Sequence, residues 1–212
     1  MKYNSLMFLT LLLSFSLQAA QVLVIGDSHT VGPFGWSLDE NLRREGFEVA
    51  TYGSCGSIAA WWMNGGVESK CGYFARNLEG ARIELKVTPK LELLLSQGDF
   101  DAVVLQFGGN YVHYSDEFIL KDVNFVVDYL QEKSLKCFWV SNPDGRSNRH
   151  LSPRILKLLT EALANRCPLF NSHLVTSYPQ VGGDGIHYWF REGMPIAREW
   201  ARKVSEAFKS WY

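Results

Sequence analysis

Short apolar segments alternate with amphipathic segments along this chain, and this alternation constrains the fold more than any other feature. Residues 21–25 are almost entirely apolar and are followed by Gly26. Such continuous apolar runs are typical of strands that are buried on both faces. The predicted strands span residues 21–25, 47–51, 101–107, 136–141 and 169–171. The predicted helices, which show helical spacing of apolar residues, span residues 36–45, 88–97, 116–133, 153–165 and 191–210.

This order of elements predicts an α/β fold. When strands and helices alternate, the strands form a parallel sheet and the connecting helices cover both of its faces. We therefore expect a three-layer α/β/α sandwich around a parallel sheet of about five strands. Residues 53–80 are rich in glycine and aromatic residues and receive no assignment.

Four short motifs follow predicted strands or precede the last predicted helix. They are Gly26-Asp27-Ser28-His29, Gly53-Ser54-Cys55-Gly56, Gly108-Gly109-Asn110 and Asp184-Gly185-Ile186-His187. Ligands of parallel sheets bind beyond the carboxyl ends of the strands, so Ser28, Gly56 and Asn110 are expected on one rim. The loop that holds Asp184 and His187 can return to the same rim.

These residue types supply the groups that acyl transfer through a covalent ester requires. Ser28 offers a hydroxyl nucleophile, His187 offers an imidazole base, and Asp184 can orient that imidazole. Asn110 offers amide N–H donors to a developing oxyanion. Each motif alone has an ordinary structural explanation, such as a helix N-cap or a surface turn. Their joint occurrence and their order favour the catalytic interpretation.

The four motifs resemble those of the SGNH, or GDSL-like, hydrolase superfamily, over nearly all of the chain after residue 20. The resemblance implies a flavodoxin-like sandwich and the hydrolysis of esters or thioesters of lipids, sugars and other small acyl groups. It implies that Ser28 is the nucleophile and that Asp184 and His187 complete a catalytic triad. It also implies an oxyanion hole made by the backbone N–H groups of Ser28 and Gly56 and by the side chain of Asn110.

Several positions around these motifs have alternative interpretations. Gly53 is an alternative to Gly56 as the oxyanion donor, although the family's spacing favours Gly56. Tyr111 stands where many relatives carry Asp, so we expect different hydrogen bonding in that loop. Asp27 is expected to be structural, and His29 is a secondary candidate for substrate contact.

The first twenty residues have the pattern of a secretory signal peptide. Lys2 precedes an apolar run that ends near Ala19 and Ala20, and this run is short for a membrane span, which needs about 20 residues. We expect residues 1–20 to be removed and residues 21–212 to form one exported domain, periplasmic or extracellular. An uncleaved anchor is the alternative. The cleavage position stays open because neither Leu17 nor Gln18 is a small residue.

The net charge of the chain argues against nucleic acid as a partner. The chain has 21 basic and 22 acidic residues, and loss of residues 1–20 removes Lys2 alone, which gives 20 minus 22, or −2. A chain of this charge without a basic run is not expected to bind nucleic acid. We also expect no stable membrane insertion after signal cleavage, and the sequence does not assign an oligomeric state.

The four cysteines predict disulfides, because an even number in an exported protein favours pairing. Three pairings are possible. A bond between Cys55 and Cys71 would close a loop beside the oxyanion region. Cys137 and Cys167 each open a predicted strand, and we favour their pairing. No Cys-x-x-Cys spacing typical of zinc occurs, and the proposed chemistry needs no metal or other cofactor.

Aromatic and polar residues near the motifs suggest the substrate. Aromatic rings stack on sugars, and arginine binds carboxylates, so five residues are candidate substrate contacts. They are Trp61, Trp62, Tyr111, His113 and Arg146. Arg149 is an alternative to Arg146, and core packing or solvation explains these residues equally well. We expect a small-molecule or glycan ester as substrate, first of all an O-acetyl group on a polysaccharide or cell-wall glycan. The alternatives are a lysophospholipase or thioesterase, an acetyl transferase, and a non-catalytic carbohydrate-binding protein.

Overall fold

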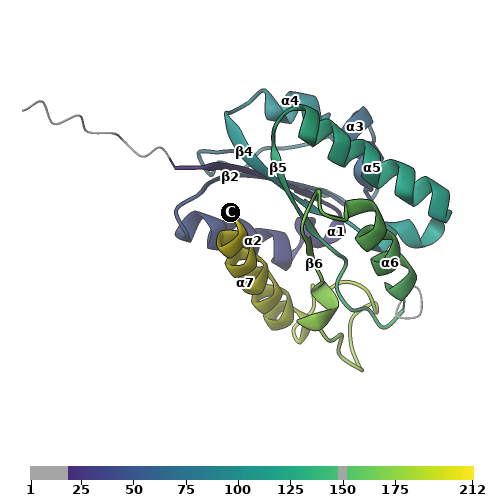
Figure 1. Cartoon of the computed structure of the whole chain (residues 1–212). Helices are drawn as coiled ribbons and strands as arrows, with labels where there is room; N and C mark the ends of the chain where they lie inside the picture. The colour runs from purple at the N-terminus through teal and green to yellow at the C-terminus, as the bar shows by residue number, and fades with distance from the viewer. Residues whose placement is uncertain (1–18, 148–151) are drawn as a thin grey trace, which may run out of the picture.

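A computed structural model of the chain describes residues 19–147 and 152–212, and within them the sheet has six strands (Figure 1). The strands are β1 Gln21–Gly26, β2 Glu48–Ser54, β3 Tyr73–Arg76, β4 Phe100–Gln106, β5 Lys136–Val140 and β6 Leu169–Phe170. Their order in the sheet is β3-β2-β1-β4-β5-β6. Five strands are parallel, and β3 pairs with β2 in the antiparallel direction at one edge. The prediction of a parallel sheet of about five strands is confirmed.

Helices cover both faces of this sheet, which confirms the three-layer sandwich. The described α-helices are α1 Ser28–Val31, α2 Pro33–Arg44, α3 Ala59–Asn64, α4 Leu91–Leu95, α5 Asp116–Glu132, α6 Ser152–Leu163 and α7 Gly193–Trp211. Figure 1 shows α2 and α7 on one face and α3, α4 and α5 on the other. Two short 3₁₀ helices, η1 Gly109–His113 and η2 Ser172–Leu174, complete the connections.

The alternation of side chains along β1 explains why two separate cores form. Leu23 and Ile25 pack into the core beneath α3, α5 and α6, whereas Val22 and Val24 pack into the core beneath α2 and α7. Successive side chains of a strand point to opposite faces of the sheet, so a strand covered on both faces is apolar throughout. The central strand therefore sits rigidly between two packed layers, and its carboxyl end is held in place.

Two disulfides join the cysteines in the predicted pairs. Cys55 bonds to Cys71, and Cys137, at the start of β5, bonds to Cys167, just before β6. The first disulfide fixes the segment after β2, and the second links two adjacent strands.

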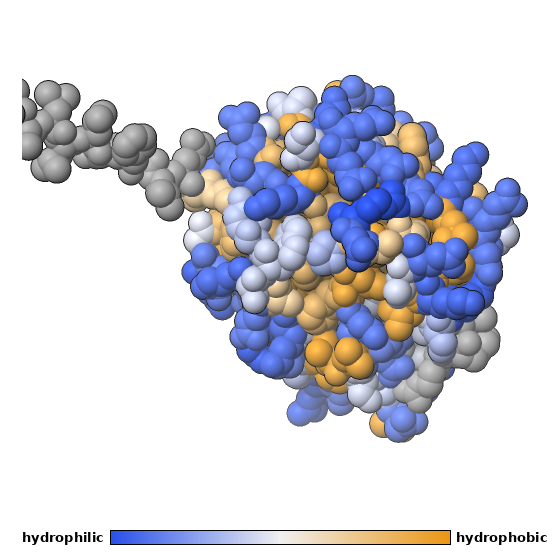
Figure 2. Space-filling model, in the orientation of Figure 1, coloured by the Kyte–Doolittle hydropathy of each residue, from blue (hydrophilic) through white to orange (hydrophobic). Residues whose placement is uncertain are grey.

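Hydrophilic side chains cover much of the molecular face in Figure 2, with smaller hydrophobic patches between them. Across residues 19–147 and 152–212, no helix is both long enough and apolar enough for a membrane span. The predicted signal peptide lies almost entirely outside the described residues.

Candidate active site

Ser28 is placed by the sharp junction between β1 and α1. Asp27 caps α1, and its Oδ1 accepts a hydrogen bond from the backbone N–H of His29 at 2.9 Å. Ser28 is thus the first residue of the helix, and the N-cap is Asp27. The junction needs glycine at position 26, because a Cβ there would lie 2.0 Å from Oγ1 of Thr30. Ser28 thus lies directly after the carboxyl end of β1 and is 6% exposed.

His187 and Asp184 approach Ser28 from the loop that precedes α7. Nε2 of His187 lies 2.9 Å from Oγ of Ser28, and Nδ1 of His187 lies 2.5 Å from Oδ2 of Asp184. A carboxylate can only accept a hydrogen bond, so Nδ1 carries the proton and Nε2 accepts from the serine hydroxyl. The three side chains form a continuous relay from carboxylate to imidazole to hydroxyl.

The relay loop is held in shape by backbone hydrogen bonds to Asp184. Its Oδ1 accepts from the backbone N–H groups of Ile186 and His187 at 2.8 and 2.7 Å. Burial alone would raise the pKa of the Asp184 carboxyl, but these hydrogen bonds and the one from the imidazole lower the pKa to about 2. Asp184 therefore stays ionised at neutral pH and keeps the imidazole in the orientation that accepts the serine proton.

Tyr178 also shapes this loop, and no motif in the sequence indicates it. Its hydroxyl accepts from the backbone N–H of Gly185 at 3.0 Å and donates to the carbonyl of His187 at 3.1 Å. Gly183 and Gly185 have φ angles of +59° and +89°, which glycine adopts without strain. A buried tyrosine and two glycines thus fold the tight turn that presents His187.

Three hydrogen-bond donors were predicted for the oxyanion: the backbone N–H groups of Ser28 and Gly56 and the side chain of Asn110. Gly56 follows β2 with a φ of +85°, and the carbon that a side chain would add there lies 3.7 Å from the Trp61 ring. In the described part of the chain, no acceptor engages the backbone N–H of Ser28 or of Gly56. Asn110, in η1, donates from Nδ2 to the carbonyl of Ser57 at 2.9 Å. These are the donors expected for an oxyanion hole.

Two of the predicted substrate contacts are instead buried and form hydrogen bonds around the segment that follows β2. Trp62 and Tyr111 are both 0% exposed, so they offer no surface to a substrate. Nε1 of Trp62 donates to Oγ of Ser57, and that hydroxyl donates to the carbonyl of Gly26. The Tyr111 hydroxyl donates to Asp122 at 2.7 Å and accepts from the backbone N–H of Ala59. The Tyr111 hydroxyl therefore connects η1 to α5 and to the start of α3.

The remaining predicted contacts lie in different environments. Trp61 is half-buried beside Gly56, and His113 is exposed at the end of η1. Arg146 donates to the backbone carbonyls of Pro179, Gln180 and Gly182, so its guanidinium holds a loop. Its predicted role as a carboxylate ligand has no support. Arg149 lies outside the described residues.

A recess of about 420 Å³ opens beside the relay. We call it the triad recess, and it is lined by Cys55, Cys71, Gly183, Asp184, His187, Trp189 and Phe190. The Trp189 ring packs edge-on to His187 with centroids 5.7 Å apart and is 44% exposed. A disulfide and two aromatic rings thus give an apolar wall next to a polar catalytic group.

Two ionisable groups beneath Ser28 have strongly shifted pKa values. Burial raises the pKa of the Asp27 carboxyl to about 7, against the opposing effect of the hydrogen bond from His29. Burial, together with the nearby His187, lowers the pKa of the His29 imidazole to about 3. His29 is therefore neutral at physiological pH, and its ring lies 5.5 Å from that of His187. It is 5% exposed and packs against Trp200, which favours a structural role.

The architecture is that of SGNH hydrolases of known structure. A GDSL-like lipase from Bacteroides thetaiotaomicron superposes with a TM-score of 0.55 at 16% identity, over 89% of this chain and 88% of that chain. A protein from Slackia heliotrinireducens that is assigned to the SGNH hydrolases has a TM-score of 0.58 at 16% identity, over 88% and 99%. The esterase EstA from a Pseudoalteromonas species has a TM-score of 0.60 at 11% identity, over 91% and 100%. No model of a known protein family and no curated protein matches the sequence. The chain therefore has the SGNH hydrolase fold, as its motifs predicted.

Proposed function

We propose that this protein is a serine hydrolase that cleaves carboxylic ester bonds. The observation that carries the proposal is the relay from Asp184 through His187 to Ser28, with hydrogen bonds of 2.5 and 2.9 Å. A serine hydroxyl attacks an ester readily only when a base removes its proton, and this relay places the base. The fold, which it shares with esterases and lipases, supports the same chemistry.

The reaction proceeds in two halves. Oγ of Ser28 bonds to the ester carbonyl carbon while Nε2 of His187 takes the hydroxyl proton. The tetrahedral intermediate then expels the alcohol, which receives that proton from His187, and the acyl group stays on Ser28. Water then attacks the acyl-serine while His187 takes its proton, and the second tetrahedral intermediate breaks its bond to Oγ of Ser28. The acid is released, and His187 returns the proton to the serine oxygen. The Asp184 carboxylate stabilises the imidazolium that forms in each half.

The oxyanion of both tetrahedral intermediates is stabilised by the donors beside Ser28. The N–H groups of Ser28 and Gly56 have no acceptor within the described residues and are therefore available to the substrate. Asn110 supplies the third donor once its bond to the Ser57 carbonyl is shared with the oxyanion or replaced by it. The two backbone donors are fixed in place and act without reorganising during the reaction, which is the source of their effect on rate.

The substrate class that we favour for an exported enzyme is a polysaccharide or cell-wall glycan that carries O-acetyl groups. Two disulfides support a location outside the reducing cytosol, in a periplasm or outside the cell. The apolar wall of the triad recess, with its exposed Trp189, suits stacking against a sugar ring or contact with a small acyl group. No cofactor enters this chemistry.

Hydrolysis of p-nitrophenyl esters from acetate to palmitate, by wild type and Ser28→Ala side by side, tests the proposal. We expect turnover of acetate that falls steeply with chain length and that is lost in Ser28→Ala. A preference for long chains would replace the glycan esterase with a lipid esterase or thioesterase. Full activity in Ser28→Ala would refute the assignment of the nucleophile.

A further inference from the structure

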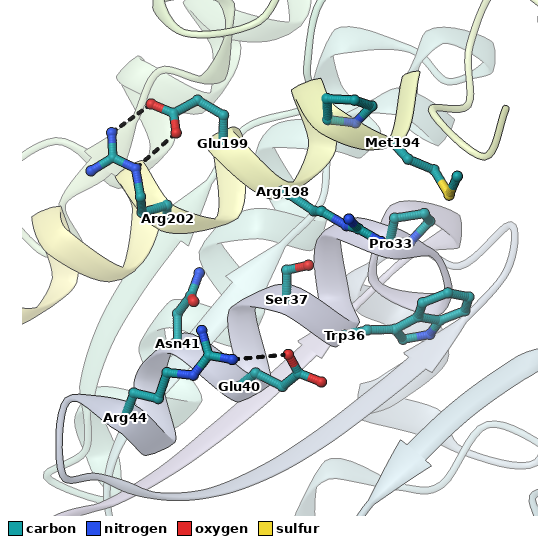
Figure 3. Close-up of a pocket in the computed structure, with 11 residues that line it drawn as sticks. Pro33, Trp36, Ser37, Glu40, Asn41, Arg44, Met194, Arg198, Glu199 and Arg202 are labelled. Carbon is teal, nitrogen blue, oxygen red and sulfur yellow. Dashed lines mark hydrogen bonds and ion pairs between the residues drawn. The ribbon is translucent and has the colours of Figure 1, made fainter. Parts of the chain in front are cut away.

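A second hollow, separate from the triad recess, lies between α2 and α7. Its volume is about 570 Å³, and we call it the α2–α7 groove. Figure 3 shows Trp36, Ser37 and Asn41 on α2, and Arg198 extending from α7 toward Pro33. None of these residues takes part in the relay or the oxyanion hole.

The groove begins next to the active site. Pro33 lines it, and the preceding Gly32 lies against Trp189, because a Cβ on Gly32 would be 3.0 Å from Nε1 of that indole. Trp189 is itself a wall of the triad recess. A ligand that leaves the recess past Trp189 therefore meets the entrance of the groove.

A second line of contacts joins the two hollows. The ring centroids of Trp36 and Phe74 are 6.3 Å apart, and Phe74 packs with Cys55 in a small hydrophobic cluster. The disulfide of Cys55 forms part of the triad recess. Trp36 is thus connected to the wall of the triad recess through Phe74 and Cys55, so the two hollows lie close together.

The groove offers polar groups that the protein itself does not use. No hydrogen bond or ion pair engages the side chains of Ser37, Asn41 or Arg198 anywhere in residues 19–147 and 152–212. Ser37 and Asn41 are four residues apart on α2 and so lie on the same side of the helix. A hydroxyl and an amide in this position can donate to and accept from the hydroxyl groups of a sugar.

Trp36 supplies a stacking surface beside these polar groups. It is 41% exposed, and its ring contacts that of Phe74. The apolar face of a sugar ring stacks on such an indole while the ring hydroxyls stay available for hydrogen bonds. The combination of an aromatic face and free polar groups is suited to a carbohydrate.

The charges of the groove favour an acidic carbohydrate. Arg44 pairs with Glu40 at 3.7 Å, and Arg202 pairs with Glu199 at 2.5 Å, so these charges largely cancel. Arg198 remains as the groove cation that no described carboxylate neutralises. The planar guanidinium of arginine binds a carboxylate with two parallel hydrogen bonds. A uronic acid residue provides that carboxylate.

We propose that the α2–α7 groove binds a uronate-containing stretch of the polysaccharide whose ester is cleaved at Ser28. This inference rests on the proposed function, because it treats the groove as a continuation of the substrate site. Trp36 stacks on a sugar ring, Arg198 binds the uronate carboxylate, and Ser37 and Asn41 bind hydroxyl groups. The groove thereby selects acidic over neutral glycan chains.

Binding to the Ser28→Ala protein tests this proposal without turnover. Calorimetry with oligogalacturonate and oligomannuronate, and with neutral xylo-oligosaccharides, measures the preference for acidic chains. In the Ser28→Ala protein, the further substitution Arg198→Ala should raise the Kd for the uronate oligosaccharides about tenfold. Trp36→Ala should raise it about two- to tenfold. Lys203→Ala, which removes a charge from α7 outside the groove, and Phe125→Ala, which removes an exposed ring from α5, are matched controls that should bind as the parent does.

The outcomes separate this inference from the proposed function. Binding of uronate oligosaccharides that depends on Arg198 and Trp36 supports the assignment of the groove as a glycan site. This holds provided that the variants unfold at the same temperature as the parent. Equal binding of acidic and neutral chains overturns the role of Arg198. Binding to neither overturns the groove as a glycan site, and Ser28-dependent hydrolysis of p-nitrophenyl acetate would then still uphold the esterase. If that hydrolysis does not depend on Ser28, the proposed function fails whatever the groove binds.

Discussion

Replacing Asp27 with Asn should change how the free energy of unfolding depends on pH. Asp27 is 1% exposed, and burial raises the pKa of its carboxyl to about 7, from a reference value of 3.8. In the unfolded chain the carboxyl ionises near pH 3.8, whereas in the folded protein it stays protonated until about pH 7. Its contribution to stability is therefore fully present below pH 3.8 and is lost as the pH rises through 7.

The size of this effect follows from the two pKa values. A shift of about 3 units corresponds to roughly 4 kcal/mol over the whole range, and the part between pH 5 and pH 8 is about 3 kcal/mol. Asn is uncharged at every pH, and its side-chain oxygen can still accept the hydrogen bond from the backbone of His29. Asp27→Asn should thus remove this pH dependence and leave the cap of α1 in place.

Urea denaturation of wild type and Asp27→Asn at pH 5 and at pH 8 measures the effect. The free energy of unfolding of the variant relative to wild type should rise by about 3 kcal/mol between the two pH values. All other titrating groups are common to both proteins and cancel in this difference. Asp99→Asn, which removes an exposed carboxylate, controls for the loss of a negative charge. Parallel pH profiles for wild type and Asp27→Asn would refute the reasoning.

Three further substitutions test the site. Asp184→Asn should lower kcat on p-nitrophenyl acetate by ~10³–10⁴, because Asn no longer holds the imidazole in the productive orientation, and a loss below tenfold would contradict the relay. Asn110→Ala should lower kcat by ~10²–10³ as one oxyanion donor is removed, and an unchanged kcat would exclude that donor. Tyr111→Phe should reduce the free energy of unfolding by ~1–3 kcal/mol, measured in urea, because it removes the side-chain donor of the buried Asp122. Stability equal to wild type would show that water replaces the tyrosine hydroxyl.

The sequence was sufficient to predict the parallel strands β1, β2, β4 and β5, because each is a mostly apolar run of five to seven residues. It was insufficient for α3 and β3, which lie in the segment left unassigned. α3 has six residues and β3 has four, so neither is long enough to establish a periodic pattern among the surrounding glycines and aromatics. Antiparallel pairing of β3 with β2 at the sheet edge depends on the tertiary fold, which a local pattern does not reveal.

The sequence was sufficient to predict the site residues whose type the chemistry dictates. It was insufficient for the residues whose role depends on whether they are buried. Ser28, His187 and Asp184 were predicted from motifs, and the structure brings their side chains within hydrogen-bond distance. Trp62 and Tyr111 were expected to face the substrate, yet they lie inside and hold the oxyanion loop. An aromatic residue next to a motif has the same sequence signature whether it points outward or inward. Only the packing around it settles its role.

Covalent labelling is the measurement that tests the central claim most directly. Wild type, Ser28→Ala and His187→Ala are incubated with an ethyl phosphonate ester that carries a p-nitrophenyl leaving group, and the products are mapped by mass spectrometry. The relay predicts one phosphonate adduct on Ser28 of the wild type, none on Ser28→Ala, and much slower labelling of His187→Ala. An unlabelled wild type, or an adduct elsewhere while Ser28 stays free, would contradict the assignment of Ser28 as the activated nucleophile.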